Sequence, residues 1–119
     1  MYIASVIDII NLIFFFMLLL LSLSNARLLF GRKYVVSKLL FLHSALSVVM
    51  ASMFIILQAQ WSIENFGSKF DDLTNLGWSL FETINSLSLL AYGVATRVFV
   101  QIGDKAENAI EKALEIKPH

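Results

Sequence analysis

The chain has 119 residues and no cysteine, and 58% of its residues are hydrophobic while only 15% are charged. Nine basic residues balance nine acidic residues. Soluble domains are ordinarily about 25% charged, and so short a chain has too little interior for this many apolar side chains. Disorder, a disulfide scaffold and a cysteine-ligated metal site are also excluded. We therefore predict an all-α integral membrane protein.

The first predicted span covers residues 2–24, because a membrane-crossing helix needs about 20 mostly apolar residues. Its apolar run exceeds the ~7–15-residue hydrophobic region of a signal peptide, and no basic residues precede it, so we expect a retained span. Asp8 and Asn11 share one face of this helix, which continues to Asn25. The remaining side chains are bulky, which favours contact with lipid or with a neighbouring subunit.

The second predicted span covers residues 34–58. Ser44, Ser47 and Ala51 form a stripe of small side chains, which lets another helix approach closely in lipid. His43 lies near the middle of this span and is the one candidate for an axial haem ligand, although a hydrogen bond to a neighbouring helix is the simpler interpretation. We predict no cofactor, and we expect bound lipid.

A loop is predicted at residues 59–75, on the outer side of the membrane. Ile63, Phe66 and Phe70 recur in it at helical spacing, although Gly67 interrupts them. The segment could form either a short amphipathic helix in the headgroup layer or an irregular loop with aromatic anchors.

The third predicted span, residues 76–102, is the most polar of the three. Because this helix is polar and the second has a small-residue face, we predict that these two form the packed pair. The first helix would then face lipid or another subunit. One face of the third span carries polar or small side chains throughout: Ser79, Glu82, Asn85, Ser86 and Gly93.

Two acidic residues, Asp8 and Glu82, fall inside predicted spans, at similar depth near the same membrane surface. Charged groups inside a bilayer are costly, so each is a candidate functional residue. The two carboxyls could share a proton or hold a hard cation. The simpler interpretation, which we favour, is that they form hydrogen bonds that fix helix register, with Asp8 also stabilising the start of its helix. A third alternative is a Lys or Arg that a partner subunit supplies to Glu82.

The tail, residues 103–119, is predicted to form a short cytoplasmic amphipathic helix. Asp104 and Glu107 have the spacing and charge typical of a helix start. The helix would continue the third span or bend from it at Gly103. We expect its apolar stripe to dock on a partner, and the stripe consists of Ala106, Ala109, Ile110, Ala113 and Leu114.

Basic residues predict the orientation of the chain. Arg27, Arg32 and Lys33 lie between the first two spans without any acid nearby, whereas the loop at 59–75 is acidic. Because cytoplasmic loops are enriched in Lys and Arg, we expect the N-terminus outside and the C-terminus in the cytoplasm. A multi-pass protein in the plasma membrane of a prokaryote fits this pattern.

The chain has no glycine-rich phosphate loop, no set of catalytic side chains and no basic patch that would bind nucleic acid. We therefore predict a non-enzymatic accessory subunit of a larger membrane complex, for example a respiratory, photosynthetic or membrane monooxygenase assembly. Its expected partners are other integral membrane subunits and the lipid bilayer. The alternatives are a homo-oligomeric holin-like pore former and a membrane sensor or adaptor.

Overall fold

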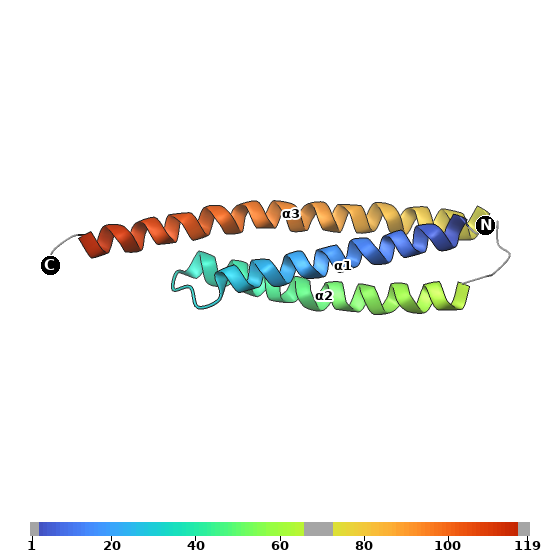
Figure 1. Cartoon of the computed structure of the whole chain (residues 1–119), viewed down its shortest axis with the longest axis horizontal. Coiled ribbons are helices and arrows are strands. Elements are labelled where there is room, and N and C mark those ends of the chain that lie inside the picture. The colour runs from blue at the N-terminus through green and yellow to red at the C-terminus, as the bar shows by residue number, and fades with distance from the viewer. Residues whose placement is uncertain (1–2, 66–72, 117–119) are drawn as a thin grey trace.

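A computed structural model describes residues 3–65 and 73–116, with side chains described for 6–64 and 76–115. Its three helices are α1 (Ile3–Leu29), α2 (Val35–Asn65) and α3 (Leu73–Ile116), and the described ranges contain no strand. Each helix is long and apolar enough to cross a membrane. Together they form a rod of 73 × 18 × 18 Å (Figure 1). The prediction of an all-α protein with three membrane-length helices is confirmed.

A tight turn joins α1 to α2. Helix α1 ends at Leu29, and Gly31 has a φ of 78°, a left-handed conformation that glycine adopts without steric cost. The Arg32 backbone N–H donates to the Leu29 carbonyl at 3.2 Å. Because this connection is so short, α1 and α2 lie antiparallel beside each other.

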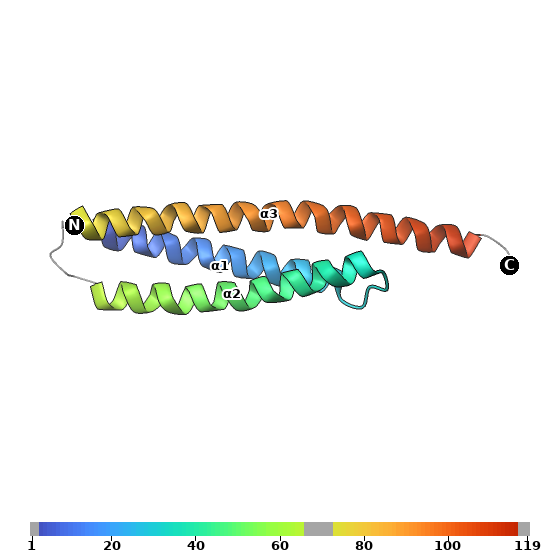
Figure 2. The same ribbon diagram turned by 180° about the vertical axis from the view of Figure 1, so that it is seen from behind.

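Helix α1 is the central helix of the bundle. It packs along both α2 and α3, whereas α2 and α3 contact each other only sparsely. Figures 1 and 2 show α1 between the other two helices from opposite sides. The prediction that the second and third helices form the packed pair, with the first facing lipid or another subunit, is therefore wrong.

The buried face of α1 explains its central position. Its buried side chains alternate at spacings of three and four residues, which is the 3.5-residue period of left-handed helix packing. Several of the bulky residues that suggested a lipid-facing helix, among them Phe16, Met17 and Leu20, do lie on the exposed remainder. The buried set contains both polar and apolar residues: Asp8, Asn11, Phe15, Leu18, Ser22, Asn25 and Leu29.

Both partner helices present buried residues at seven-residue intervals, and most of them are small. Small residues allow helix backbones to approach closely in lipid. At Gly93, a Cβ atom would lie 3.0 Å from Leu18 Cδ1 and 3.1 Å from Leu21 Cδ2, so α1 leaves almost no space there. The repeated positions are Ser37, Ser44, Ala51 and Gln58 on α2, and Ser79, Ser86, Gly93, Val100 and Glu107 on α3.

Helix α3 has 44 residues and is therefore about 66 Å long, roughly twice the ~30 Å hydrocarbon thickness of a bilayer. It passes through Gly103 without a break, so the tail is the end of α3 and the expected boundary at residue 103 does not interrupt the helix. In Figure 1 the red end of α3 extends past the α1–α2 turn.

The connection between α2 and α3 is shorter than the predicted loop at 59–75. Helix α2 continues to Asn65, and α3 already begins at Leu73. The two interpretations of the segment that contains Phe66 and Phe70 concern residues outside the described ranges.

Candidate polar and aromatic site

The two ends of the bundle differ in their side chains. Trp61 and Trp78 lie at one end, which we call the tryptophan end, and Arg27, Arg32 and Lys33 lie at the other, the arginine end. Polar side chains gather near each end, and separate hollows between α2 and α3 lie along the bundle.

At the tryptophan end, Asp8 links all three helices. Its side chain is buried, and its Oδ1 accepts a 2.8 Å hydrogen bond from the Ser79 hydroxyl on α3. The side chains of Gln58 and Trp61, both on α2, also donate hydrogen bonds to this carboxylate. Several donors thus compensate the cost of placing an acid among membrane helices.

Asn11 lies one turn further along α1 and is completely buried. Its Nδ2 donates to the Ser79 carbonyl at 3.2 Å, and its Oδ1 accepts from the Ser86 hydroxyl at 3.3 Å. The structure thus brings four residues of the sequence-predicted polar stripes together, namely Asp8, Asn11, Ser79 and Ser86. Asn85, from the same stripe of α3, is half-buried.

Glu82 has a different environment from Asp8. It is half-buried, and among the described residues no hydrogen-bond donor and no cation contacts its carboxylate. Asp8 is bonded to Ser79, Gln58 and Trp61 instead of to Glu82. Within the described ranges, no three His, Asp or Glu side chains come close enough to hold a metal ion.

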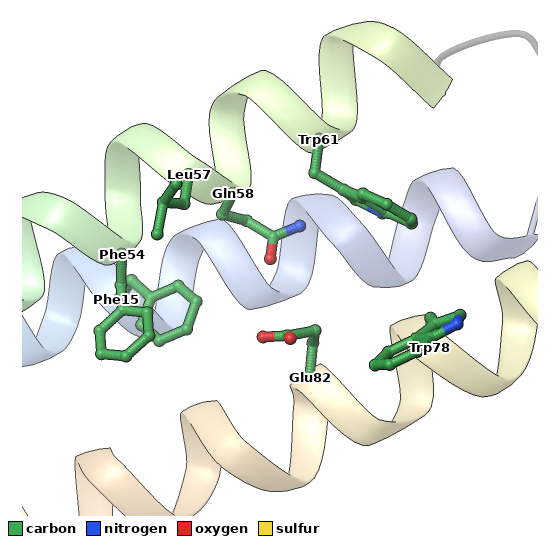
Figure 3. Close-up of a pocket in the computed structure, with 7 residues that line it drawn as sticks. All are labelled: Phe15, Phe54, Leu57, Gln58, Trp61, Trp78 and Glu82. Carbon is green, nitrogen blue, oxygen red and sulfur yellow. The ribbon is translucent and has the colours of Figure 1, made fainter.

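Glu82 lines a cavity of about 430 Å³ between α2 and α3, which we call the aromatic cavity. The Phe15 and Phe54 rings form one wall and stack at 5.2 Å between ring centroids. In Figure 3, Gln58 from α2 and Glu82 from α3 point into the cavity from opposite sides. The complete lining is Phe15, Phe54, Leu57, Gln58, Trp61, Trp78 and Glu82.

Two further hollows between α2 and α3 lie nearer the arginine end, and His43 and Tyr92 line both of them. The His43 ring meets the edge of the Tyr92 ring at 5.4 Å between centroids. Haem ligation by His43 stays an untested alternative, and the described part of the chain offers no second histidine as the other axial ligand.

The small-residue stripe of α2 is directed largely inward. Ser44 and Ala51 are buried, whereas Ser47 lines one of the hollows beside His43 and donates to the His43 carbonyl at 3.0 Å. The Ser44 hydroxyl is buried without a hydrogen-bond partner in the described structure. Ser44 and Ala51 therefore serve close packing through their small size.

Arg97 is a polar contact that sequence reasoning missed. From α3 it reaches across to α1, where its Nη1 donates to Ser24 Oγ at 2.7 Å and to Asn25 Oδ1 at 3.2 Å. Ser24 and Arg97 lie 73 residues apart, so no local pattern links them.

At the arginine end, α3 is bound to the α1–α2 turn. Arg32 forms an ion pair with Asp104, and its Nη1 donates to Asn108 Oδ1 at 2.9 Å. Glu107 accepts from the Lys33 backbone N–H at 2.9 Å and from the Ser37 hydroxyl at 2.8 Å. The two acids that were expected to start a tail helix instead attach α3 to the turn.

Glu107 lies in the charged part of α3 beyond the apolar segment, and it is buried. Burial by itself raises the pKa of its carboxyl. The hydrogen bonds from Lys33 and Ser37 lower this pKa, as do a hydrogen bond from the Tyr34 backbone and the Arg32 charge. The lowering contributions prevail, so the pKa of Glu107 lies below its usual 4.5.

This lowered pKa makes the attachment of α3 dependent on pH. Above the unfolded pKa the stabilisation by Glu107 is fully present, and it is lost as pH falls through the lower, folded pKa. At neutral pH, we expect the native protein to have a higher free energy of unfolding than Glu107→Gln, measured by denaturant unfolding in detergent. The difference should shrink as pH falls below about 4.5. A difference that does not change with pH would contradict this assignment.

The face of α3 that packs on the other helices continues past the turn. Leu114 lies seven residues after Glu107, and Ile110 seven residues after Gly103, which faces Leu40 of α2. Ile110 is 46% exposed and Leu114 is 52% exposed. We call these two residues the tail seam. The other members of the predicted apolar stripe, Ala106, Ala109 and Ala113, are exposed as well.

These features define the chain as an all-helical protein with three helices that can span a membrane. No protein-family model, no curated protein and no solved structure matches it.

Proposed function

We propose that this chain is a small non-catalytic accessory subunit of a larger multi-subunit membrane complex. In this role α1 holds α2 and α3 together, and the tail seam binds another integral membrane subunit. We assign it no catalysis and no cofactor of its own. Lipid is expected to cover the exposed apolar faces of the helices.

One observation carries this proposal: the face of α3 that packs on α1 and α2 continues beyond the turn that joins those two helices. The buried series that contains Val100 and Glu107 continues to Leu114, where the described chain offers nothing to cover it. Exposed apolar side chains that extend an existing packing face are typical of an interface. A helix from a partner subunit could continue the same packing.

Purification of the full chain from its native membranes tests this proposal. We expect native mass spectrometry to show a complex of fixed stoichiometry with at least one other protein. The double variant Ile110→Gln and Leu114→Gln should lose that partner. The matched control, Lys105→Gln and Lys112→Gln, changes two exposed residues of the same helix that lie outside the tail seam and should keep it. Glutamine is a good helix former, so both variants preserve α3.

Three outcomes would contradict the proposal. A monodisperse monomer would exclude an obligatory subunit, and a homo-oligomer alone would favour the pore-forming alternative. Equal loss of the partner in both double variants would show that the tail seam does not bind it.

We further propose that the arginine end lies in the cytoplasm, with the N-terminus outside, in the plasma membrane of a prokaryote. Support comes from Arg27, Arg32 and Lys33 at that end and from Glu64 at the other. The chain has no native cysteine, so single cysteines can report the orientation. An impermeant maleimide should label position 64 from outside and position 33 only after permeabilisation, and the reverse pattern would overturn this orientation.

A further inference from the structure

We propose that the aromatic cavity binds a hydrophobic cation, such as a quaternary ammonium or phosphonium ion, with Glu82 as its counter-ion. This site goes beyond the proposed function, because it lies at the opposite end of α3 from the tail seam. The proposal depends on the shape of the cavity, the rings that line it and the state of the Glu82 carboxylate.

The cavity walls suit a cation that carries apolar groups. Trp61, Trp78, Phe15 and Phe54 supply aromatic surface, and a cation near an aromatic ring is attracted by its electron-rich face. Tryptophan is the strongest of the aromatic residues in this interaction. A volume of about 430 Å³ falls within the range of small-molecule sites, about 300–1,000 Å³.

Glu82 supplies the charge. No described donor or cation contacts its carboxylate, so the acid stands at membrane depth without a partner among the described residues. An unpaired charge in such surroundings is costly, and a bound cation would remove that cost. Asp8, the other acid, is already bonded to Ser79 and to α2. One of the two acids is therefore committed to packing, and the other is available to a ligand.

The choice of a hydrophobic cation over a metal follows from the lining. A hard metal ion needs several oxygen ligands, whereas the cavity offers one carboxylate and the Gln58 amide among apolar side chains. A quaternary cation has no N–H group to satisfy and is weakly hydrated. Since α2 and α3 contact each other sparsely, such a ligand could enter from the bilayer between them.

The two tryptophans of the chain both line the cavity, so intrinsic fluorescence reports on it directly. Tetraphenylphosphonium is titrated into the purified full chain in nanodiscs. We expect a saturable change in fluorescence, with an apparent affinity that falls at least about tenfold in Glu82→Gln. The matched control Glu64→Gln removes an exposed acid from the same end and should bind as the native protein does. Tetraphenylborate, an anion of similar shape, should give no saturable change.

Three results would overturn the site. The native protein could show no saturable binding of the phosphonium, it could bind the borate equally well, or Glu82→Gln could bind the phosphonium with unchanged affinity. If Glu82→Gln fails to fold, Glu82→Asp and the comparison of the two ions on native protein decide the question. Failure here would leave the tail seam untouched, since partner binding is measured with different variants.

Discussion

Replacing Asp8 by alanine should destabilise the bundle by about 2–4 kcal/mol, measured by reversible unfolding in mixed micelles. Asp8 accepts hydrogen bonds from both neighbouring helices, and each interhelical bond in a membrane contributes about 0.6 kcal/mol on average and up to ~1.7. Truncation would also leave the buried Ser79 hydroxyl without its acceptor. Asp8→Asn keeps an acceptor oxygen and should lose less.

Glu82→Ala is the matched control for that measurement. Glu82 is the other acid in an apolar span, and it has no described partner to lose, so its replacement should leave the unfolding free energy unchanged or raise it. Equal losses for Asp8→Ala and Glu82→Ala would contradict the assignment of Asp8 to packing and Glu82 to a ligand.

Gly93→Leu should separate α1 from α3. Even a Cβ atom at position 93 would lie at 3.0–3.1 Å from the side chains of Leu18 and Leu21, so a full leucine side chain would overfill the contact. Overpacking of this kind costs about 1–3 kcal/mol and sometimes more. The displaced helices would also weaken the bond between Arg97 and Ser24. Mixed-micelle unfolding would measure the loss.

Gly77→Leu provides the control on the same helix. A Cβ atom at position 77 would have no neighbour within 4 Å, and leucine favours a helix over glycine by roughly 0.5–1 kcal/mol. We therefore expect Gly77→Leu to leave stability unchanged or to raise it. A comparable loss at both glycines would show that α1 does not approach α3 closely at Gly93.

The sequence was sufficient to predict the three helices, because length and freedom from charge decide whether a segment can cross a membrane. It was not sufficient to identify the central helix. Lipid-facing and buried side chains are equally apolar, so the bulky surface of α1 concealed its buried stripe. The seven-residue spacing of Ser44, Ala51 and Gln58 on α2 was the available signal, and the same spacing on α3 would have placed both helices against α1.

The contacts of the tail could not be predicted from the sequence for a different reason. Asp104 and Glu107 match a helix start by local spacing, but their partners are Arg32, Lys33 and Ser37, some 70 residues earlier. Pairings of this kind depend on how long α3 is relative to the α1–α2 hairpin, which no local pattern records. Asp8 and Glu82 were both visible as intramembrane acids, whereas their different environments emerge only once Gln58 and Ser79 are placed.

Photo-cross-linking in native membranes tests the central claim that the tail seam binds another subunit. A photoactivatable phenylalanine analogue at position 114 should give one discrete product that contains another integral membrane protein. The same analogue at position 112, which is exposed and lies off the tail seam, should not give this product. Equal products at both positions, or a product at position 114 that contains only lipid or a second copy of this chain, would contradict the account.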